Sequence, residues 1–417
     1  MLEKLFKLKE NKTDVRTEVV AGITTFMTMA YILAVNPSVL SAAGMDHGAV
    51  FTATAIAACI GTLLMALFAN YPFALAPGMG LNAYFAYTVV LQMGYSWKVA
   101  LAAVLVEGII FILLSLLSVR EAIFDAIPYN LKKAVSVGIG LFIAFIGLQN
   151  AKVVIGGSTL LSLFSLDGYN KNLAAAAGGK DFVAASMNDV GITVLLAIIG
   201  IIITGIMVVK NVKGNILWGI LITWVLGIIC QFAGLYVPNP ELGFYSLLPD
   251  FSAGISIPSL SPIFAKFSLE GVPILEFVVI VFAFLFVDLF DTLGTLIGVS
   301  SKANMLDKDG KLPRIKGALL ADAVGTTAGA VLGTSTTTTF VESSSGVAEG
   351  GRTGLTAVTT AVLFGLSLFL SPIFLAIPSF ATAPALVIVG FYMLSAVTDI
   401  NFADAAEGIP AFICIAA

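Results

Sequence analysis

Apolar runs of about twenty residues recur along most of this chain, and a run of that length crosses a lipid bilayer as one helix. Hydrophobic residues make up 59% of the 417 positions and charged residues only 11%, against about 25% charged in a soluble domain. The sequence therefore predicts an all-α polytopic membrane protein. The predicted spans are 18–36, 50–69, 73–92, 97–118, 131–149, 191–209, 214–233, 274–300, 316–333, 334–350, 353–372 and 382–399. A thirteenth run begins near Ile409, and its shortness leads us to expect that the chain ends within a span.

Basic residues are distributed unevenly around these spans. Most of the 21 Lys and Arg residues precede the first span or fall in connections that follow even-numbered spans. The long connections 150–190 and 234–273 carry few of them. Because cytoplasmic loops are enriched in Lys and Arg, we expect a multi-pass protein of the plasma membrane with a cytoplasmic N-terminus.

Two of the predicted spans contain residues that oppose a continuous helix. Span three carries Pro72, Pro77, Gly78 and Gly80, and span ten carries four consecutive threonines at 336–339. Proline lacks a backbone donor, and β-branched threonine favours extended backbone. We expect each segment to enter the membrane as a short strand and to continue as a half-helix. The two strands could pair with each other, because lipid leaves no unpaired backbone satisfied.

The two broken spans occupy matching places in the chain. Gly61-Thr62 precedes Gly78 by the same number of residues as Gly325-Thr326 precedes Glu342. Span three is third from the start, and span ten is third from span eight. This pattern predicts a transporter fold of two inverted repeats of seven spans each. Interrupted spans at corresponding positions of two halves indicate a substrate site.

Acidic residues lie at membrane depth in this region. Asp288 and Asp291 follow an apolar run and share a helix face, and Glu342 lies where the extended part of span ten should meet its half-helix. A carboxylate near the bilayer centre costs roughly 2.5–3.5 kcal/mol, which favours a site for a small hydrogen-bonding solute over a purely structural tie. Asp291 is also a candidate cap for a neighbouring half-helix. For Glu342 the alternative is an N-terminal cap aided by the serines 343–345.

Other polar and aromatic residues within the spans are candidates with plain structural alternatives. Phe340 could stack on a flat ligand, and the Asn82 amide could both donate and accept; ordinary packing or interhelical bonding is the alternative. Glu107 and Asp322 could serve proton coupling or bond between helices. The single histidine, His47, is expected to be solvated. Without metal-ligand spacing or a catalytic group, the sequence predicts no enzyme, metal or cofactor.

Four stretches of the chain resemble the AzgA-like purine permeases of the nucleobase–ascorbate transporter superfamily, and the similarity covers essentially the whole length. They are residues 24–33, 76–83, 286–296 and 333–347. The resemblance implies fourteen spans in two inverted repeats of seven, of which about twelve and a half are present, with short strands in spans three and ten. It also implies a mobile core domain, 1–118 and 274–372, and a gate domain, 119–273 and 373–417, that mediates homodimerisation.

The resemblance also assigns roles to particular residues. Asp288 and Glu342 match the substrate-binding acids of the family, and Asn82 matches its polar residue of span three. Beyond the resemblance, we expect Glu342 and Asp288 to bind opposite parts of the edge of the base. Backbone amides around Gly78, Met79 and Gly80, and those of Val341 to Ser343, would complete the site, and Phe340 would cover one face of the base.

The expected activity is uptake of a purine nucleobase (hypoxanthine, guanine or adenine) by proton symport, with no nucleic-acid partner. Burial favours the neutral form of a carboxyl group, so Glu342, Asp288, Asp291 or Glu107 could carry the coupled proton. Coupling to sodium is one alternative. Another is an anion transporter of the same fold, for sulfate or bicarbonate, although acids at the site would repel an anion.

Overall fold

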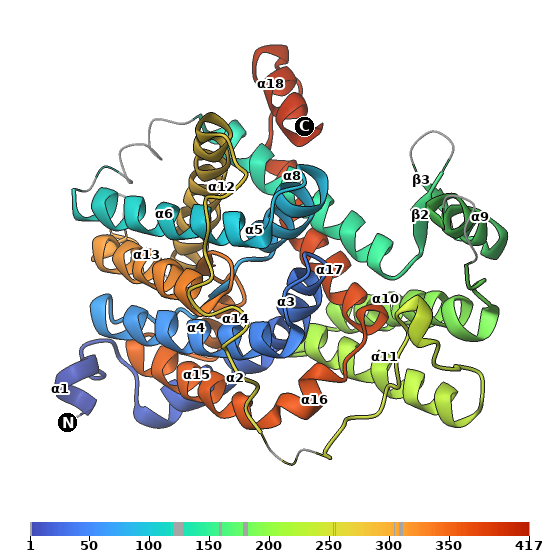
Figure 1. Cartoon of the computed structure of the whole chain (residues 1–417). Helices are drawn as coiled ribbons and strands as arrows, with labels where there is room; N and C mark the ends of the chain where they lie inside the picture. Colours follow the sequence, from blue (N-terminus) through green and yellow to red (C-terminus); the bar gives the residue numbers. More distant parts are fainter. Residues whose placement is uncertain are drawn as a thin grey trace. The chain divides into compact units, whose positions relative to one another are not determined.

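The computed structural model of the chain describes residues 2–117, 119, 128–157, 161–177, 182–252, 254, 256–303, 305–307 and 312–416 (Figure 1). Arg120, Lys180, Lys308 and Lys311, which contribute to the predicted orientation, lie outside these ranges. Within them, nine helices are long and apolar enough to cross a membrane. The predicted all-α polytopic class is confirmed.

The chain divides into two compact units. One comprises Met1–Ile139, Ile255–Ser371 and Ala396–Ala417, and the other comprises Gly140–Gly254 and Pro372–Ser395. The functional division into core and gate domains stays a prediction.

The first unit holds both broken spans. Its elements are α1 (Leu2–Phe6), α2 (Val15–Met29), α3 (Ile32–Ser41), α4 (His47–Phe68), β1 (Leu75–Pro77), α5 (Met79–Ala83), η1 (Tyr84–Gln92), α6 (Trp97–Leu116), α12 (Ile274–Lys302), α13 (Ile315–Leu332), β4 (Thr337–Thr339), α14 (Ser343–Ala348), α15 (Gly354–Ser367), η4 (Leu368–Leu370) and α18 (Ala405–Ala416). The division between the units passes through or beside α8 (Tyr129–Asn150), α16 (Ser371–Leu375) and η5 (Ser395–Asp399).

The second unit packs three long helices. Its elements are β2 (Val154–Gly156), β3 (Leu161–Leu163), α9 (Leu166–Ala177), η2 (Met187–Gly191), α10 (Ile192–Val209), α11 (Asn215–Phe232), η3 (Pro240–Leu242) and α17 (Ser379–Leu394). Helix α10 packs against α11 and α17. The indole of Trp224 on α11 donates a 2.8 Å hydrogen bond to the Leu247 carbonyl and fastens the following loop to this helix.

The two extended pieces of the broken spans form an antiparallel two-stranded sheet. The paired residues are Leu75 with Thr339, Ala76 with Thr338, and Pro77 with Thr337. Beyond the strands, the Phe340 amide donates to the Ala74 carbonyl at 3.0 Å, and the Gly78 amide donates to the Thr336 carbonyl at 2.9 Å. All six strand residues are buried. The predicted pairing of the two pieces is therefore confirmed, and it satisfies backbone groups that lipid would leave unpaired.

Each strand is held by a threonine from the preceding helix, and the two arrangements match. On α4, the Thr62 hydroxyl donates to the Leu75 carbonyl at 3.1 Å and accepts from the Leu75 amide at 2.9 Å. On α13, the Thr326 hydroxyl donates to the Thr337 carbonyl at 3.0 Å and accepts from the Thr337 amide at 3.2 Å. This correspondence explains why Gly-Thr pairs recur at equivalent positions, and it gives the inverted repeat a structural basis.

The glycines of these pairs allow α4 and α13 to approach each other closely. A Cβ atom on Gly325 would lie 3.3 Å from the Gly61 Cα, and one on Gly61 would lie 3.2 Å from Cγ2 of Thr337. The two helices run side by side in Figure 1, and α13 also packs against α6. Larger side chains here would move the helices apart and displace the strands that they hold.

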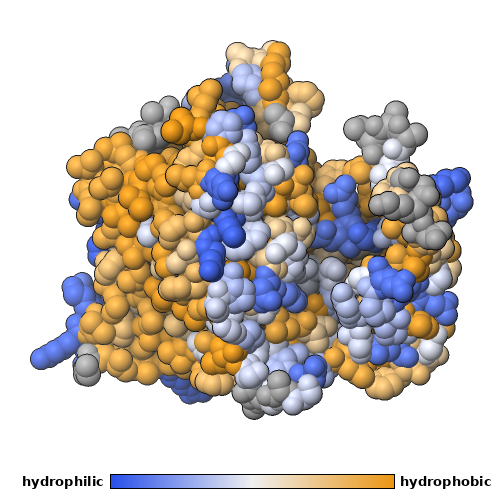
Figure 2. Space-filling model, viewed as in Figure 1, coloured by the Kyte–Doolittle hydropathy of each residue, from blue (hydrophilic) through white to orange (hydrophobic). Residues whose placement is uncertain are grey.

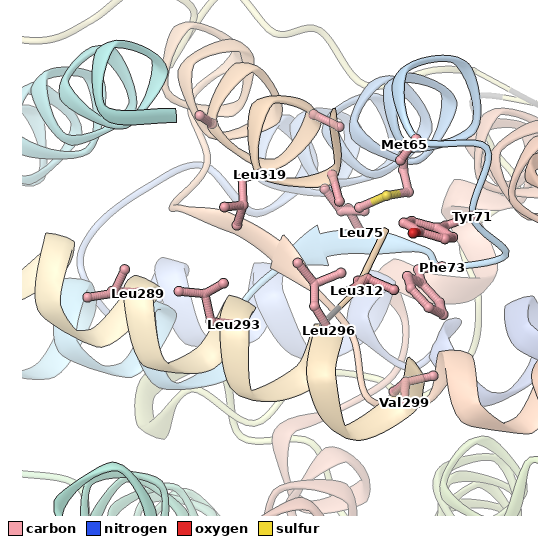
Figure 3. Packing of buried hydrophobic residues seen from close by; sticks show 14 of the residues in the cluster. Met65, Tyr71, Phe73, Leu75, Leu289, Leu293, Leu296, Val299, Leu312 and Leu319 are labelled. Atoms are coloured by element: carbon pink, nitrogen blue, oxygen red, sulfur yellow. The ribbon is translucent and has the colours of Figure 1, made fainter. Parts of the chain in front are cut away.

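A hydrophobic cluster surrounds the paired strands (Figure 3). It includes Tyr71, Phe73 and Leu75 at the start of the broken span, and leucines from one face of α12, such as Leu289 and Leu293. Apolar side chains also cover much of the visible outer surface over α6 and α13 (Figure 2). Such a surface suits contact with lipid, so the polar groups of the unit gather inside it.

Candidate functional site

Each strand of the pair is followed within a few residues by a short helix. Helix α5 begins at Met79 after Gly78, and α14 begins at Ser343 after Glu342. The first amides of α14 are satisfied by the preceding backbone, since Ser343 donates to the Phe340 carbonyl at 3.1 Å and Ser344 donates to the Val341 carbonyl at 3.0 Å. The predicted half-helices are confirmed in position.

Glu342 occupies the residue before α14, but its side chain turns elsewhere. Its Oε1 atom accepts a 2.7 Å hydrogen bond from the hydroxyl of Tyr31. The expected alternative role, a side-chain cap of α14, is absent among the described residues. Tyr31 lies between α2 and α3 and is 1% exposed. The sequence analysis did not predict Tyr31 as a site residue. The one feature that could have indicated it is the presence of a tyrosine inside an apolar span.

Asp291 lies beside the paired strands. Its Oδ2 atom accepts a 3.1 Å hydrogen bond from the Thr338 hydroxyl on β4. A Cβ atom placed on Gly78 would lie 3.3 Å from the same oxygen. The Asp291 carboxylate therefore sits next to the start of α5, where we expected it as a cap. It is also within electrostatic range of Glu342 and Asp322.

Asp288 lies one turn earlier on α12 and is completely buried. The Thr292 hydroxyl oxygen is 2.8 Å from Oδ1 of Asp288 and 2.8 Å from Oδ1 of Asp322 on α13. One hydroxyl thus lies between two buried carboxyl groups. Asp288, which the sequence favoured for direct contact with substrate, faces this helix pair, whereas Asp291 faces the strands.

Hydroxyl groups before and along β4 bond to the other polar residues at membrane depth. The Ser335 hydroxyl donates to Oδ1 of Asn82. The Thr336 hydroxyl donates to Oε2 of Glu107 on α6 at 2.6 Å. Asn82 and Glu107 are both completely buried, and each bonds to the extended part of span ten, so the hydrogen bonding between spans that we weighed as an alternative is present for each. These bonds give a role to Ser335 and Thr336 within the Ser- and Thr-rich part of span ten.

The remaining predicted site residues lie at the same junction. Met79 is buried, with its sulfur 3.9 Å from Nδ2 of Asn82. The Ser343 hydroxyl accepts from the Ala74 amide at 3.0 Å and so ties α14 to the first broken span. Phe340 is buried, whereas Val341 is 47% exposed.

Two further buried polar residues escaped the sequence analysis. Asn36 on α3 donates to the hydroxyls of Thr54 at 2.7 Å and Thr334 at 2.9 Å. It therefore links span one to the start of span ten. Glu18 on α2 accepts hydrogen bonds from the backbone at the start of α15. Among the described residues, no cluster of His, Cys, Asp and Glu could hold a metal ion.

Comparison with known proteins matches this architecture. The pattern described as Permease family covers residues 16–417. The guanine/hypoxanthine permease PbuO of Bacillus subtilis is 43% identical over 99% of this chain and 89% of its own length. The adenine permease AdeP of Escherichia coli is 41% identical, over 99% and 84% respectively.

A solved structure shows the same fold at low sequence identity. The transmembrane domain of the cyanobacterial bicarbonate transporter BicA superposes with a TM-score of 0.68 at 15% identity, covering 96% of this chain and 94% of that one. The predicted fold of seven plus seven spans is confirmed by this likeness. The match of the Permease family over almost the whole chain, and the close relatives, show that this multi-pass membrane protein belongs to that family.

Proposed function

We propose that this protein imports purine nucleobases across the plasma membrane by proton symport, with hypoxanthine and guanine as the preferred bases. The observation that carries the proposal is the placement of the Glu342 and Asp291 carboxylates at the ends of the paired strands. The relatives support the class of substrate, because they are named as permeases for guanine, hypoxanthine and adenine.

The chemistry of Glu342 suits the edge of a purine. Its Oε1 atom is held by Tyr31, which leaves Oε2 to accept an N–H group from a ligand. Hypoxanthine and guanine carry an N–H beside the C6 carbonyl, where adenine carries a ring acceptor. Charge-assisted hydrogen bonds of this kind are the stronger ones. The flat faces of the base would contact Phe340 and Val341.

The rest of the predicted set completes the proposed site. Asp291 would bind the opposite edge of the base. Because Gly78 has no side chain, the ligand could approach the backbone of Gly78 and Met79 closely. Asp288 and Asn82 would support the site without contacting the base. Asp288 bonds to the Thr292 hydroxyl, and Asn82 bonds to the Ser335 hydroxyl. Ser343 keeps the two broken spans together.

The position of Thr292 supports a proton-carrying role for Asp288. A hydroxyl has one proton and donates to one acceptor, yet two carboxyl groups lie 2.8 Å from the Thr292 oxygen. Both hydrogen bonds can form when one carboxyl group is protonated and donates to the Thr292 oxygen while the hydroxyl donates to the other carboxylate. We infer that Asp288 and Asp322 share the coupled proton through Thr292. Glu107, which is buried, and the partly buried Glu342 and Asp291 are the other acids that could take part.

Transport would follow from motion of the core domain against the gate domain, with the N-terminus in the cytoplasm. The apolar outer surface over α6 and α13 (Figure 2) suits contact with lipid, and we propose that the gate domain mediates a homodimer. Crosslinking in native membranes tests the dimer, and protease access to the N-terminus from either side tests the orientation.

Anion transport is the rival function, since the structural neighbour BicA is a bicarbonate transporter. Its likeness shows the fold alone. Glu342 and Asp291 place carboxyl groups beside the starts of α14 and α5, and negative charge there disfavours an anion. An anion substrate would therefore meet repulsion at both helix ends.

The test is uptake of radiolabelled hypoxanthine, guanine, adenine and uracil by cells that lack their own permeases and express this protein. We expect saturable purine uptake that a protonophore abolishes and that sodium-free medium leaves unchanged. Glu342→Gln should abolish accumulation while the protein still reaches the membrane. Full uptake by this variant, or uptake of bicarbonate instead of purines, would refute the assignment.

A further inference from the structure

A cavity of about 520 Å³ lies in the first unit, apart from the paired strands. It is lined by Glu10, Asn11, Lys12, Tyr71, Ala303, Met305, Pro313, Arg314 and Arg352. These residues come from the N-terminal segment and from connections that the positive-inside rule places in the cytoplasm. Its volume is that of an ordinary small-molecule site. None of the residues proposed to bind the purine lines it.

The cavity has a surplus of positive charge. Lys12, Arg314 and Arg352 line it, and in the described part of the chain none of the three forms an ion pair with a carboxylate. The one acidic lining residue, Glu10, pairs with Lys7 at 3.2 Å, and Lys7 is not part of the lining. The cationic groups are therefore available to an anion.

Two of these cations are held in place. The Arg352 guanidinium donates through Nη1 to the carbonyls of Val347 and Gly351, each at 2.7 Å, and an arginine has further N–H groups beyond these. Arg314 is the residue immediately before α13 and has a left-handed backbone with a φ of +59°. Its guanidinium lies over the Tyr71 ring, 4.8 Å from the centroid.

Tyr71 supplies an independent indication of a ligand. It lines the cavity, and its side chain is 2% exposed. Its hydroxyl makes no hydrogen bond of normal geometry to any described residue, although the Arg314 side chain lies near enough to interact with it. Most buried polar atoms in native proteins have a well-formed partner, so this hydroxyl can still bond to a ligand. Figure 3 shows Tyr71 among the residues of the hydrophobic cluster, beside Phe73, and an anion in the cavity would have to reach its hydroxyl from the Arg314 side.

We propose that this cavity binds a phosphate-bearing anion whose apolar or aromatic body packs against Met305 and Pro313. Arginine recognises phosphate oxygens through paired N–H groups, and Lys12 adds a third positive charge. Two sources share this chemistry: a free nucleoside monophosphate and the headgroup of an anionic phospholipid. The site is separate from the proposed purine site and does not depend on it.

The experiment titrates the purified full chain in phosphatidylcholine nanodiscs with guanosine monophosphate and with inorganic phosphate by calorimetry. A second arm measures phosphatidylglycerol retained by the protein in native mass spectrometry. Lys12→Gln and Arg314→Gln should weaken binding of the phosphate compound by about tenfold or more, since each removes a charge-assisted bond. Tyr71→Phe tests the hydroxyl alone.

The matched control is Lys4→Gln, which removes one positive charge from the exposed N-terminal helix α1, outside the lining. The site is supported if the nucleotide, phosphate or the lipid binds tightly and if this binding is weakened only in the cavity variants. The probe that binds identifies the source. Absence of binding by all three probes, or equal losses in Lys4→Gln, overturns it. Glu342→Gln should retain anion binding even where purine uptake is lost.

Discussion

The hydroxyl of Tyr31 donates a hydrogen bond of 2.7 Å to Oε1 of Glu342, across 311 positions of sequence. Tyr31 lies where span one breaks between α2 and α3, and Glu342 lies where span ten passes from β4 to α14. The Thr28 hydroxyl, 3.5 Å from the Glu342 carbonyl, adds a weaker contact at the same crossing. Span one therefore orients the proposed substrate-binding carboxylate.

Tyr31→Phe should raise the KM for purine uptake by about tenfold or more, since a hydrogen bond to a charged group contributes about 1.5–3 kcal/mol. The phenyl ring keeps the buried volume, so membrane insertion should be unchanged. Uptake kinetics in permease-deficient cells measure the effect. Tyr245→Phe, at a 65% exposed position, is the control for loss of a tyrosine hydroxyl. Equal KM values in the two variants would remove Tyr31 from the site.

Thr292→Val should separate proton coupling from substrate binding. The valine preserves shape but removes the hydroxyl between Asp288 and Asp322, and leaving a buried polar group unsatisfied costs about 1–3 kcal/mol. We expect a maximal uptake rate at least tenfold lower, an altered dependence on external pH, and nearly unchanged binding of the base.

The control for this variant is Thr327→Val, whose hydroxyl bonds to the Ala323 carbonyl of its own helix at 2.9 Å. Uptake against pH and equilibrium binding of labelled base are measured for both variants. A pH profile of Thr292→Val identical to that of Thr327→Val would contradict the shared proton.

Gly346→Ala should disrupt the crossing between α2 and α14. A Cβ atom on Gly346 would lie 2.6 Å from the Ala21 carbonyl oxygen and would also meet the Thr25 hydroxyl. Overpacking of this kind costs about 1–3 kcal/mol, and the displaced helix would carry Glu342 away from Tyr31. We expect a lower thermal unfolding midpoint and loss of uptake.

Gly365→Ala makes the matched comparison, because its added Cβ would meet only Cys59 Sγ, at 3.8 Å, an ordinary contact. Thermal unfolding of the purified variants and uptake in cells measure both effects. Wild-type uptake by Gly346→Ala would show that the close approach of α14 to α2 is not required.

The architecture was predictable because its signals are local. Prolines, glycines and a threonine run interrupt two spans, and the bilayer leaves exposed strands no partner except each other. The matching Gly-Thr pairs were the evidence for the inverted repeat. In the structure, Thr62 and Thr326 of these pairs bond to the two strands. These inferences needed only spacing and residue type.

The partners of the buried acids were not predictable in the same way. Three-residue spacing put Asp288 and Asp291 on one helix face, but the rotation of α12 against α13 and β4 decides that Asp288 meets Thr292 and Asp291 meets Thr338. The bond from Glu18 to Thr356 joins residues 338 positions apart. A single sequence contains no record of such pairings.

Glu18→Gln should destabilise the protein without touching the proposed site. Oε1 of Glu18 accepts from the Arg352 amide at 2.9 Å. Oε2 accepts from the amides of Thr353 and Thr356, each at 3.2 Å, and from the Thr356 hydroxyl at 2.6 Å. The carboxylate thus caps α15 from another helix, and Glu18 itself is completely buried.

A glutamine turns an NH2 group toward these donors, so at least one of the bonds is lost, at about 1.5–3 kcal/mol for a bond to a charged group. We expect a lower thermal unfolding midpoint in detergent, lower protein levels in the membrane, and an unchanged KM for the molecules that fold. Glu270→Gln, at an exposed loop position, is the control for loss of one carboxylate. If Glu18→Gln unfolds at the same midpoint as the control, the buried cap contributes nothing to stability. If Glu18→Gln raises the KM, the start of α15 is coupled to the substrate site.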